Sequence, residues 1–495
     1  MVSIEPLAYH SATLSMERYN YGIVRQFAVM VLAWGVLGMV VGVYLAGELI
    51  WPALNLDLPG LTFGRLRPIH TALTVFGFGG SLLFATSYYV IQRTCQVRLV
   101  GDFLPKFTFW GWQAAVVLGV VSELLGYTQS HEYAEFEWPI DLLIGGVWLA
   151  YLWVYTITLY RRSQPQLYVA NWFFLACLLA MVLLHTAGNL VVLVNILGMK
   201  SYSRFAGVQD AMIQWWYGNN LVTFLLNIAG LGMMYYFVPK QAGRPLYSYR
   251  LSIIHFWSLI FLSVWGGPHH LYWTALPDWA ATLGVTFSVM LLLPSWAGVI
   301  NGIMTLSDAW DRLRTDPVLR FLIVALVFYG LATIDGVLMS FETINAVTHY
   351  TDWTIGHAHV GTMGWVAMTA FGVLYHLIPR LWNTKLYSMR LVSIHFWAAL
   401  GGIVLYTSAL GIAGINQGQR LRVLDEYGNI AYSFMETDAF LNSPYLARGL
   451  GGTLFLLGMV VMVYNLFVTI TQVQRERAAI EARIAAKLAV KGHPT

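Results

Sequence analysis

Long apolar runs alternate with short polar segments along almost the whole chain. Twelve runs approach the ~20 residues that a membrane-spanning helix requires, and they are centred near residues 37, 80, 117, 150, 182, 226, 263, 292, 329, 370, 402 and 459. No clear internal repeat accompanies them. The pattern predicts an all-α membrane protein of twelve transmembrane helices, with residues 1–471 forming one membrane domain. The sequence of residues 472–495 predicts a basic amphipathic helix on the cytoplasmic surface.

The positions of Lys and Arg orient these helices. If both termini are cytoplasmic, the inner segments hold 21 of the 28 Lys and Arg residues, and the outer segments hold the other seven. Cytoplasmic loops of membrane proteins carry this kind of excess. The sequence therefore predicts that both termini lie inside.

Composition supports the membrane assignment. Hydrophobic residues make up 58% of the chain and charged residues 11%, against roughly 45–50% and about 25% in soluble domains. So few charges exclude a soluble enzyme, and a net charge of +4 gives no reason to expect a nucleic-acid partner. The two cysteines form no CxxCH motif, so no covalently attached haem is expected.

Five histidines are predicted to lie at one depth, near the outer ends of three helices: His70, His269, His270, His357 and His359. Ionisable residues inside spans are costly and are therefore functional candidates. His357 and His359 are two positions apart, which places them about 200° apart around a helix. One helix could then supply axial ligands to two haems. His70 could complete a six-coordinate haem with one of the pair, and the other haem would keep an open position for a gas.

Several strings resemble the catalytic subunit of the C-type (cbb-type) haem–copper oxidases. They are RLRPIHTAL, ANWFF, DAMIQWWYG, MMYYFVPKQAGRPLYSYRLSIIHFW, WGGPHHLYWTALPDWA and HYTDWTIGHAHVGTMGWVAM. The resemblance extends over nearly the whole chain and implies a twelve-helix haem–copper oxidase bundle. It also implies two haems of the b type, one low-spin and one high-spin, in a multi-pass protein of the bacterial inner membrane.

The resemblance assigns roles to individual residues. His70 and His359 match the ligands of the low-spin haem, His357 matches the proximal ligand of the high-spin haem, and His269 and His270 match two ligands of a second metal. Further residues match more loosely: Ser252 and Tyr329 in an inner proton path, Asp335 on the proximal side of a haem, Arg448 beside the haem propionates, and one of Glu132, Glu135 and Glu137, with Glu135 preferred, at a calcium ion.

Two positions depart from the oxidase pattern. Asn219 occupies the position of the third histidine on the second metal, and Ser263 occupies the position of the tyrosine cross-linked to that histidine in the oxidases. An amide oxygen is a harder ligand than imidazole, so it suits iron better than it suits copper. The tyrosine supplies an electron and a proton when dioxygen is cleaved, and a site without it is poorly equipped for that step.

These departures make nitric oxide reduction to nitrous oxide the first hypothesis for the activity. Dioxygen reduction by a cbb-type cytochrome c oxidase, with or without proton pumping, is the alternative, and a catalytically silent or transporting haem bundle is a third. The second metal is iron or copper, the substrate is NO or O2, and electrons would come from a haem c-bearing subunit or cytochrome c in a hetero-oligomer. The glutamate that nitric oxide reductases usually place near the metal is absent from the matching position, Thr223.

Overall fold

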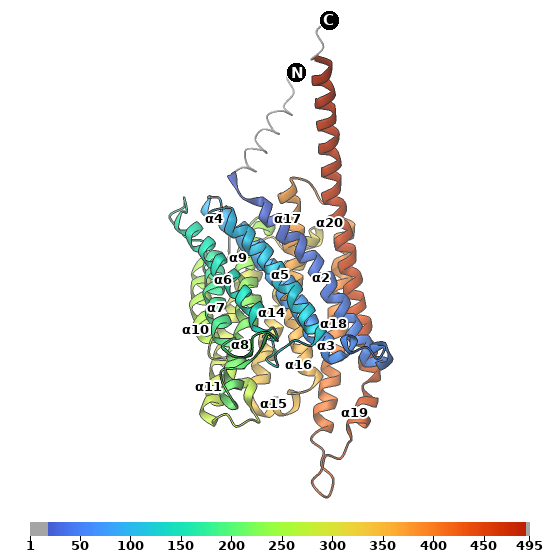
Figure 1. The fold of residues 1–495 in the computed structure, drawn as a ribbon. Helices are drawn as coiled ribbons and strands as arrows, with labels where there is room; N and C mark the ends of the chain where they lie inside the picture. The colour runs from blue at the N-terminus through green and yellow to red at the C-terminus, as the bar shows by residue number, and fades with distance from the viewer. Residues whose placement is uncertain (1–17, 492–495) are drawn as a thin grey trace.

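The computed structural model describes residues 18–491, with side chains described as far as residue 473. Helices build nearly all of this part of the chain (Figure 1). In chain order they are α2 (Tyr21–Ile50), η1 (Pro52–Asn55), η2 (Pro59–Leu61), α3 (Phe63–Thr71), η3 (Ala72–Gly80), α4 (Ser81–Cys95), α5 (Phe103–Leu125), α6 (Trp138–Tyr160), α7 (Val169–Gly188), α8 (Val208–Leu221), η4 (Val222–Ile228), α9 (Ala229–Ala242), α10 (Tyr249–Ser263), η5 (Gly267–Leu271), α11 (Asp278–Met290), α12 (Leu292–Met304), α13 (Arg312–Thr315), α14 (Pro317–Ser340), α15 (Glu342–Thr348), α16 (Asp352–His359), η6 (Val360–Ala367), α17 (Met368–Trp382), α18 (Met389–Arg420), α19 (Phe434–Phe440) and α20 (Asn442–Lys491). Strands β1 (Val191–Asn195) and β2 (Lys200–Ser203) pair as an antiparallel hairpin.

Eleven helical segments of the described chain are long and apolar enough to cross a membrane. The run expected near residue 263 is shorter, because α10 has 15 residues and so measures about 22 Å at 1.5 Å per residue. Gly266, Gly267 and Pro268 follow it and form the tight turn η5. An all-helical membrane fold is therefore established, while the count of twelve spans and the side on which the termini lie stay predictions.

The last helix, α20, runs without a break to Lys491 and projects beyond the bundle (Figure 1). The surface helix predicted for residues 472–495 is thus a continuation of the final span, as far as its backbone is described. Its side chains beyond residue 473 and its last four residues lie outside the described part.

Three segments form the centre of the bundle: Phe63–Cys95, Val208–Ala242 and Asp352–Trp382 are the most deeply buried of the spans. Each contains a π-helical stretch at its middle, namely η3, η4 and η6. Such widened turns are rare and occur mostly at functional sites. Four of the predicted site residues lie on these segments, His70, Asn219, His357 and His359.

An internal repeat relates these segments, so the expectation that the chain has none is wrong. Each of α4, α9 and α17 ends at a residue in the left-handed region, respectively Gln96, Gly243 and Asn383. A tyrosine hydroxyl near each end hydrogen-bonds a residue 20 positions later, in the pairs Tyr88–Thr108, Tyr235–His255 and Tyr375–His395. The strings LYSYRLSIIHFW (246–257) and LYSMRLVSIHFW (386–397) carry two of these copies.

Identical polar contacts start the helix that follows in two copies. Ser248 and Ser388 cap the N-termini of α10 and α18 through their side chains. Asn301 bonds both the amide and the carbonyl of Ser248, and Asn465 does the same to Ser388. These bonds satisfy backbone groups that a helix end leaves open.

Helices α18 and α20 pack at very close range through glycine. A methyl group on Gly402 would lie 2.7 Å from the carbonyl oxygen of Gly451 and 2.8 Å from the amide of Phe455. Only a residue without a side chain permits that approach. This contact holds the final span against the helix that borders one side of the central cavity.

Candidate cofactor-binding site

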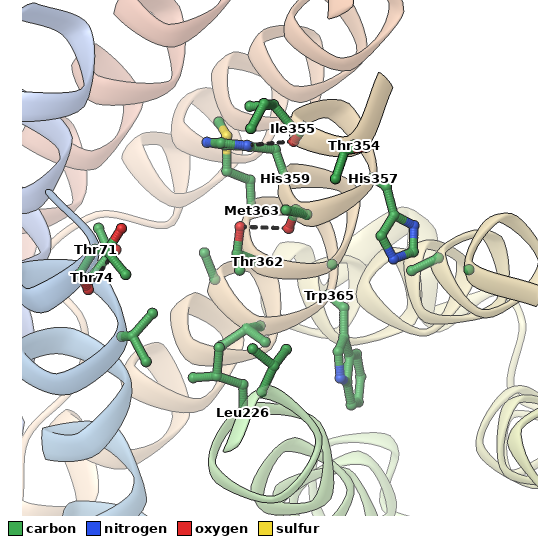
Figure 2. A pocket seen from close by; sticks show the side chains of 18 of the residues that line it. Thr71, Thr74, Leu226, Thr354, Ile355, His357, His359, Thr362, Met363 and Trp365 are labelled. Carbon is green, nitrogen blue, oxygen red and sulfur yellow. Dashed lines mark hydrogen bonds between the residues drawn. The ribbon is translucent and has the colours of Figure 1, made fainter. Parts of the chain in front are cut away.

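A cavity of about 870 Å³ lies among the central helices, toward the upper end of the range for ligand pockets. It gathers eight of the residues predicted from the sequence around one space: His70, Asn219, Ser263, His269, His270, Tyr329, His357 and His359. Arg448 also lines it. Figure 2 shows part of this cavity, with His357 and His359 turned toward different sides of the same helix. The prediction from their two-residue spacing is thus confirmed.

His70 and His359 have the same hydrogen-bonding arrangement. Nδ1 of His70 lies 2.7 Å from the carbonyl oxygen of Gly38, and Nδ1 of His359 lies 2.7 Å from that of Ile355. A carbonyl can only accept, so Nδ1 carries the proton in both rings and Nε2 keeps its lone pair. Metal-bound histidines usually show this arrangement. The two rings therefore fit axial ligands of one haem.

The backbone of α2 makes room for the His70 ring. A methyl group on Gly42 would lie 2.6 Å from Cε1 of His70, well inside van der Waals contact. Glycine at this position therefore lets the imidazole stand between α2 and the cavity. The carbonyl of Gly38, one turn earlier, then orients the ring.

His357 is oriented by a carboxylate. Its Nδ1 lies 3.1 Å from Oδ2 of Asp335 on α14, and Nε1 of Trp353 donates to Oδ1 of the same carboxylate at 3.1 Å. Asp335 itself is not a cavity-lining residue, so it acts behind the ring. A carboxylate in this position raises the basicity of the ligating imidazole.

The candidates for the second metal lie on η5 and α8. Nδ1 of His269 lies 2.8 Å from the hydroxyl of Ser288, and Nε2 of His270 lies 3.3 Å from Oδ1 of Asn219. The His270 ring stacks on Trp215 with centroids 4.1 Å apart, and the two imidazole centroids are 4.2 Å apart. The tight turn formed by Gly266, Gly267 and Pro268 thus brings the adjacent histidine rings together.

This donor set contains two imidazoles and one amide. Among the side chains described as far as residue 473, no group of three His, Cys, Asp or Glu is placed to hold a metal. Asn219 Oδ1 is then the nearest candidate for a third ligand beside His270. Ser263 lines the same cavity, but its hydroxyl bonds the carbonyl of Ile260 in its own helix.

A charged network closes the cavity beside His359. Arg448 pairs with Asp352 at 3.4 Å and donates from Nε to the hydroxyl of Tyr406 at 3.2 Å. That hydroxyl lies 3.4 Å from Nε2 of His359. The sequence reasoning named Arg448 but missed Tyr406, and it also missed Ser288 and Trp215 of the second-metal region. Trp215 lies in the string DAMIQWWYG, one turn before Asn219 on α8, but nothing in that string marks it as a neighbour of His270. Tyr406 and Ser288 carry no local signal, because they reach the site from α18 and α11.

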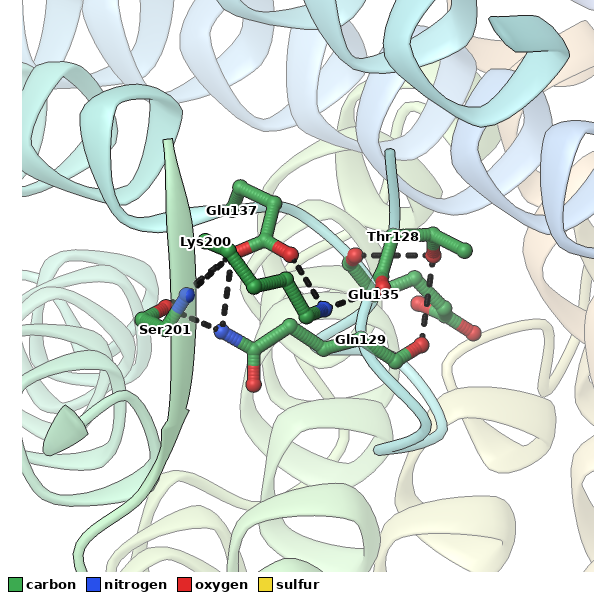
Figure 3. A network of polar contacts seen from close by, with 6 residues as sticks. All are labelled: Thr128, Gln129, Glu135, Glu137, Lys200 and Ser201. Atoms are coloured by element: carbon green, nitrogen blue, oxygen red, sulfur yellow. Dashed lines mark hydrogen bonds and ion pairs between the residues drawn. The ribbon is translucent and has the colours of Figure 1, made fainter. Parts of the chain in front are cut away.

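Three outer-loop carboxylates have separate environments. Glu132 lines the cavity and pairs with Arg67 at 2.9 Å. Glu137 is buried and bound by Lys200 at 2.6 Å and by Ser201, in the network that fixes the β1–β2 hairpin (Figure 3). Burial raises the pKa of Glu135 to about 7, with a further contribution from the charge of Glu132.

Other predicted residues lie elsewhere. Ser252 is buried in the first turn of α10, where its hydroxyl bonds the carbonyl of Tyr249, and it does not line the cavity. Four buried histidines outside the cavity serve as hydrogen-bonding core residues: His185 bonds the carbonyl of Asp141, His255 and His395 bond tyrosines, and His376 bonds Gln241.

An apolar groove lies immediately behind the second-metal region. Leu262, Leu293, Pro294, Trp296 and Ile334 are among its lining residues. Their chain neighbours Ser263, Ser295 and Thr333 line the central cavity instead. One layer of side chains therefore separates the two spaces.

Comparison with known proteins establishes the family. Residues 22–454 match the family Cytochrome C and Quinol oxidase polypeptide I, and the chain belongs to it. The Cbb3-type cytochrome c oxidase subunit CcoN1 of Stutzerimonas stutzeri is 52% identical over 474 residues, covering 96% of this chain and 100% of that protein. The cytochrome c oxidase subunit 1 homolog (bacteroid) of Bradyrhizobium diazoefficiens is 52% identical over 91% of this chain and 82% of its own length.

A solved structure agrees on the fold. A haem–copper terminal oxidase dimer studied by cryo-electron microscopy aligns with a TM-score of 0.72, covering 90% of this chain and 83% of that chain. Sequence identity is 15%. This likeness concerns the helical bundle alone.

These relatives overturn the first hypothesis for the activity, nitric oxide reduction. A nitric oxide reductase chain of Stutzerimonas stutzeri is only 25% identical over 94% of this chain and 95% of its own length, against 52% for the oxidase of the same organism. The prediction gave two side chains, Asn219 and Ser263, more weight than the rest of the chain. Single replacements change a ligand locally, while the overall sequence remains that of the oxidase relatives.

Proposed function

We propose that the chain is the catalytic subunit of a cbb-type cytochrome c oxidase that reduces dioxygen to water. The observation that carries this proposal is the shared cavity of the five histidines, four of which have Nδ1 in a hydrogen bond. This leaves Nε2 as the ligating atom, which in His359 lies 3.4 Å from the Tyr406 hydroxyl. Buried imidazoles with this orientation suit metal ligation. The oxidase names of relatives at 52% identity favour dioxygen as the substrate.

The residues divide into three ligand sets. His70 and His359 would hold a low-spin haem, His357 a high-spin haem, and His269, His270 and Asn219 the second metal, copper or iron. When bound, these groups would supply electron transfer and dioxygen binding. We propose b-type haems at both haem sites, and copper or iron as the second metal.

The protein side chains then set orientation and charge. The Asp335 carboxylate fixes the His357 ring and makes its imidazole a stronger donor. Arg448, held by Asp352 and Tyr406 next to His359, would neutralise the haem propionates. Because His357 and His359 are two residues apart on α16, their helix keeps the two haem sites at a short, fixed separation.

Tyr329 is our candidate for the proton donor in place of the tyrosine that the chain lacks at position 263. It lines the cavity, and its buried hydroxyl lies beside the side chains of Ser295 and Asn227, which line the same cavity. Its ring stacks on Trp365 with centroids 4.9 Å apart. A phenol so placed can pass its proton to polar groups of the cavity. Ser252 would belong to the path that reprotonates it.

The apolar groove behind Ser263 suits the delivery of an uncharged gas. Dioxygen dissolves in the bilayer, and the groove is bordered by leucine, proline, tryptophan and isoleucine. A small gas has to pass only the single layer of side chains to enter the cavity. Ions and water would meet an apolar barrier there.

The remaining assignments follow from the same proposal. Electrons would come from cytochrome c or a haem c-bearing subunit, because the chain has no CxxCH motif, and the complex would be a hetero-oligomer in a bacterial inner membrane. Both termini would be cytoplasmic, and α10 would add one span to the eleven long apolar helices of the described chain, which gives twelve in total. Proton pumping and a calcium ion at Glu135 stay predictions.

The test is gas turnover by the purified complex. With a reductant and cytochrome c supplied, we expect dioxygen uptake that His357→Ala and His270→Ala abolish. His131→Gln is the matched control, because this outer-loop histidine is engaged by Asp210 at 2.9 Å and its replacement should leave uptake unchanged. Metal analysis of each preparation establishes that the haems are present.

A complex that holds both haems and the second metal yet consumes dioxygen only at the rate of the His357→Ala variant would refute the proposal. Nitrous oxide formation from added NO, measured in parallel, shows which gas the site turns over. Copper at one atom per two haems supports the oxidase assignment of the second metal.

A further inference from the structure

Three cations occupy equivalent positions at one end of the central bundle. Arg93 on α4, Lys240 on α9 and Arg380 on α17 each lie three residues before the left-handed residue that ends their helix. The internal repeat therefore places one cation from each copy at the face where α2 begins, here called the inner face (Figure 1). Equivalent positions on three contacting elements bring side chains toward a common axis.

Ring and charge contacts show that the three positions converge. The guanidinium groups of Arg93 and Arg380 both act electrostatically on the phenols of Tyr89 and Tyr236. The ammonium group of Lys240 lies 5.9 Å from the centroid of the Tyr236 ring. The Tyr89 and Tyr236 rings are themselves 6.1 Å apart. The cations from α4, α9 and α17 thus surround one aromatic floor.

A histidine completes this floor on the third copy. His376 precedes Arg380 by four residues, as Tyr89 precedes Arg93 and Tyr236 precedes Lys240. Its ring lies 5.3 Å from that of Phe237, and its Nδ1 contacts Gln241. The aromatic and histidine side chains of this floor contact one another, and the three cations lie at its exposed side.

No carboxylate in the described chain neutralises the three cations. The ion pairs found among residues 18–473 involve none of them. Asp316 contacts Gln241, the neighbour of Lys240 in the chain, and accepts a hydrogen bond from its side-chain amide at 2.5 Å. All three cations are exposed at the inner face.

Helix dipoles offset only part of this charge. Each helix C-terminus carries roughly −0.5 of an elementary charge, so three ends leave about half of the three positive charges uncompensated. Arg380 also donates to the carbonyl of His376 at 2.7 Å, which uses one of its five N–H groups. Donors and charge therefore remain available to an external anion.

We propose that Arg93, Lys240 and Arg380 form a binding site for a phosphate-bearing anion at the inner face. Arginine suits phosphate because its planar fork donates two parallel hydrogen bonds, and lysine adds a point charge. The phosphate can belong to a soluble compound or to an anionic lipid headgroup, and the two sources present the same chemistry to the site. Neither the haem cavity nor the proposed reaction is needed for this binding.

The experiment measures binding of sodium pyrophosphate to the purified complex by calorimetry at low ionic strength. One unit charge at about 4 Å in water contributes about 1 kcal/mol, which is about fivefold in affinity. Arg93→Gln, Lys240→Gln and Arg380→Gln should each weaken binding about fivefold, and the triple variant about a hundredfold. Added salt should weaken binding to the unaltered protein.

Arg98→Gln is the matched control, since Arg98 is an inner-face arginine already paired with Asp102. It should bind pyrophosphate as the unaltered protein does. Arg93→Lys and Arg380→Lys retain the charge and should recover most of the affinity. Unchanged haem absorption and elution volume verify that each variant is folded.

A second arm separates the sources of phosphate. The complex is placed in nanodiscs of phosphatidylcholine alone or with phosphatidylglycerol, and pyrophosphate binding is measured again. Loss of pyrophosphate binding only in the phosphatidylglycerol discs assigns the site to lipid headgroups, and retention assigns it to soluble anions. The proposal is overturned if pyrophosphate does not bind in phosphatidylcholine discs, or if the triple variant binds it as tightly as the unaltered protein.

Discussion

Asp335→Asn should raise the reduction potential of the haem proposed to be held by His357. The Asp335 carboxylate lies 3.1 Å from Nδ1 of His357, and its negative charge favours the oxidised, more positive state of the metal. The amide keeps the shape and can still accept this hydrogen bond. Only the charge is removed, so the oxidised state loses stabilisation relative to the reduced state.

The magnitude follows from the hydrogen bond. A bond to a charged group contributes about 1.5–3 kcal/mol and a neutral bond about 0.5–1.5 kcal/mol, so the substitution changes it by about 1–1.5 kcal/mol. For a one-electron couple, ~1.4 kcal/mol corresponds to ~59 mV. The expected rise is therefore about 40–60 mV if the whole difference falls on the oxidised state. Partial exposure of both side chains, 31% and 23%, lowers it toward the smaller value.

The assay is a spectroelectrochemical titration of the purified complex, with the two haems followed at separate wavelengths. Trp353→Phe serves as the control, because it removes the other donor to Asp335 at 3.1 Å and leaves the carboxylate charged. It should not raise the potential. An Asp335→Asn variant whose high-spin haem titrates at an unchanged or lower potential would refute the reasoning, as would a shift confined to the low-spin haem.

Three further predictions concern the ligands and the packing. Gly42→Ala places a methyl group 2.6 Å from the ring of His70 and should displace it, seen as loss of the low-spin haem spectrum with the high-spin haem retained; equal loss of both would contradict a local effect. Asn219→Ala should lower the content of the second metal, measured by elemental analysis against both haems, and an unchanged content would show that the amide is not a ligand. Gly402→Ala clashes with the backbone of α20 and should lower the free energy of unfolding, measured by thermal unfolding, by at least about 1–3 kcal/mol. Gly401→Ala is the control, because the atom nearest to the added methyl group is 3.5 Å away, and it should lower stability much less. Similar losses in both variants would contradict the packing argument.

Much of the candidate site could be predicted from the sequence because charged and polar residues are rare in it. His357 and His359 lie close in the chain, so helix geometry alone gives their opposite directions, and this was confirmed. Other predictions lacked such a local basis. Glu135 was preferred as the calcium ligand, and that assignment stays a prediction. Of the three outer-loop glutamates, Glu132 lines the cavity and Glu137 is bound by Lys200, because contacts between elements decide where each loop side chain points.

The internal repeat marks another limit. Two of its copies share the strings that end in HFW. The third copy, LPKFTFW (104–110), keeps the Leu, Phe and Trp of those strings and has Thr108 in place of the histidine. Three shared residues are a weak signal in the sequence, and the helix ends and hydrogen bonds establish that the Tyr88–Thr108 pair is equivalent to Tyr235–His255. Hydrogen-bonded positions persist where residue identities have changed, so an internal repeat can be evident in space and weak in the chain.

The sequence by itself determined that the protein lies in a lipid bilayer, that its fold is helical, and that five histidines are the candidate ligands. Membrane helices need long apolar runs, and an imidazole in such a run is rare enough to be informative. The tertiary structure decided which groups serve each histidine, since Gly38, Asp335, Ser288 and Trp215 come from other helices. Hydrogen bonds depend on distance and direction between elements, and hydrophobic periodicity carries neither. Neither the sequence by itself nor the tertiary structure decides between the two gases; it is the 52% identity of the whole chain to oxidase subunits, against 25% to a nitric oxide reductase, that favours dioxygen.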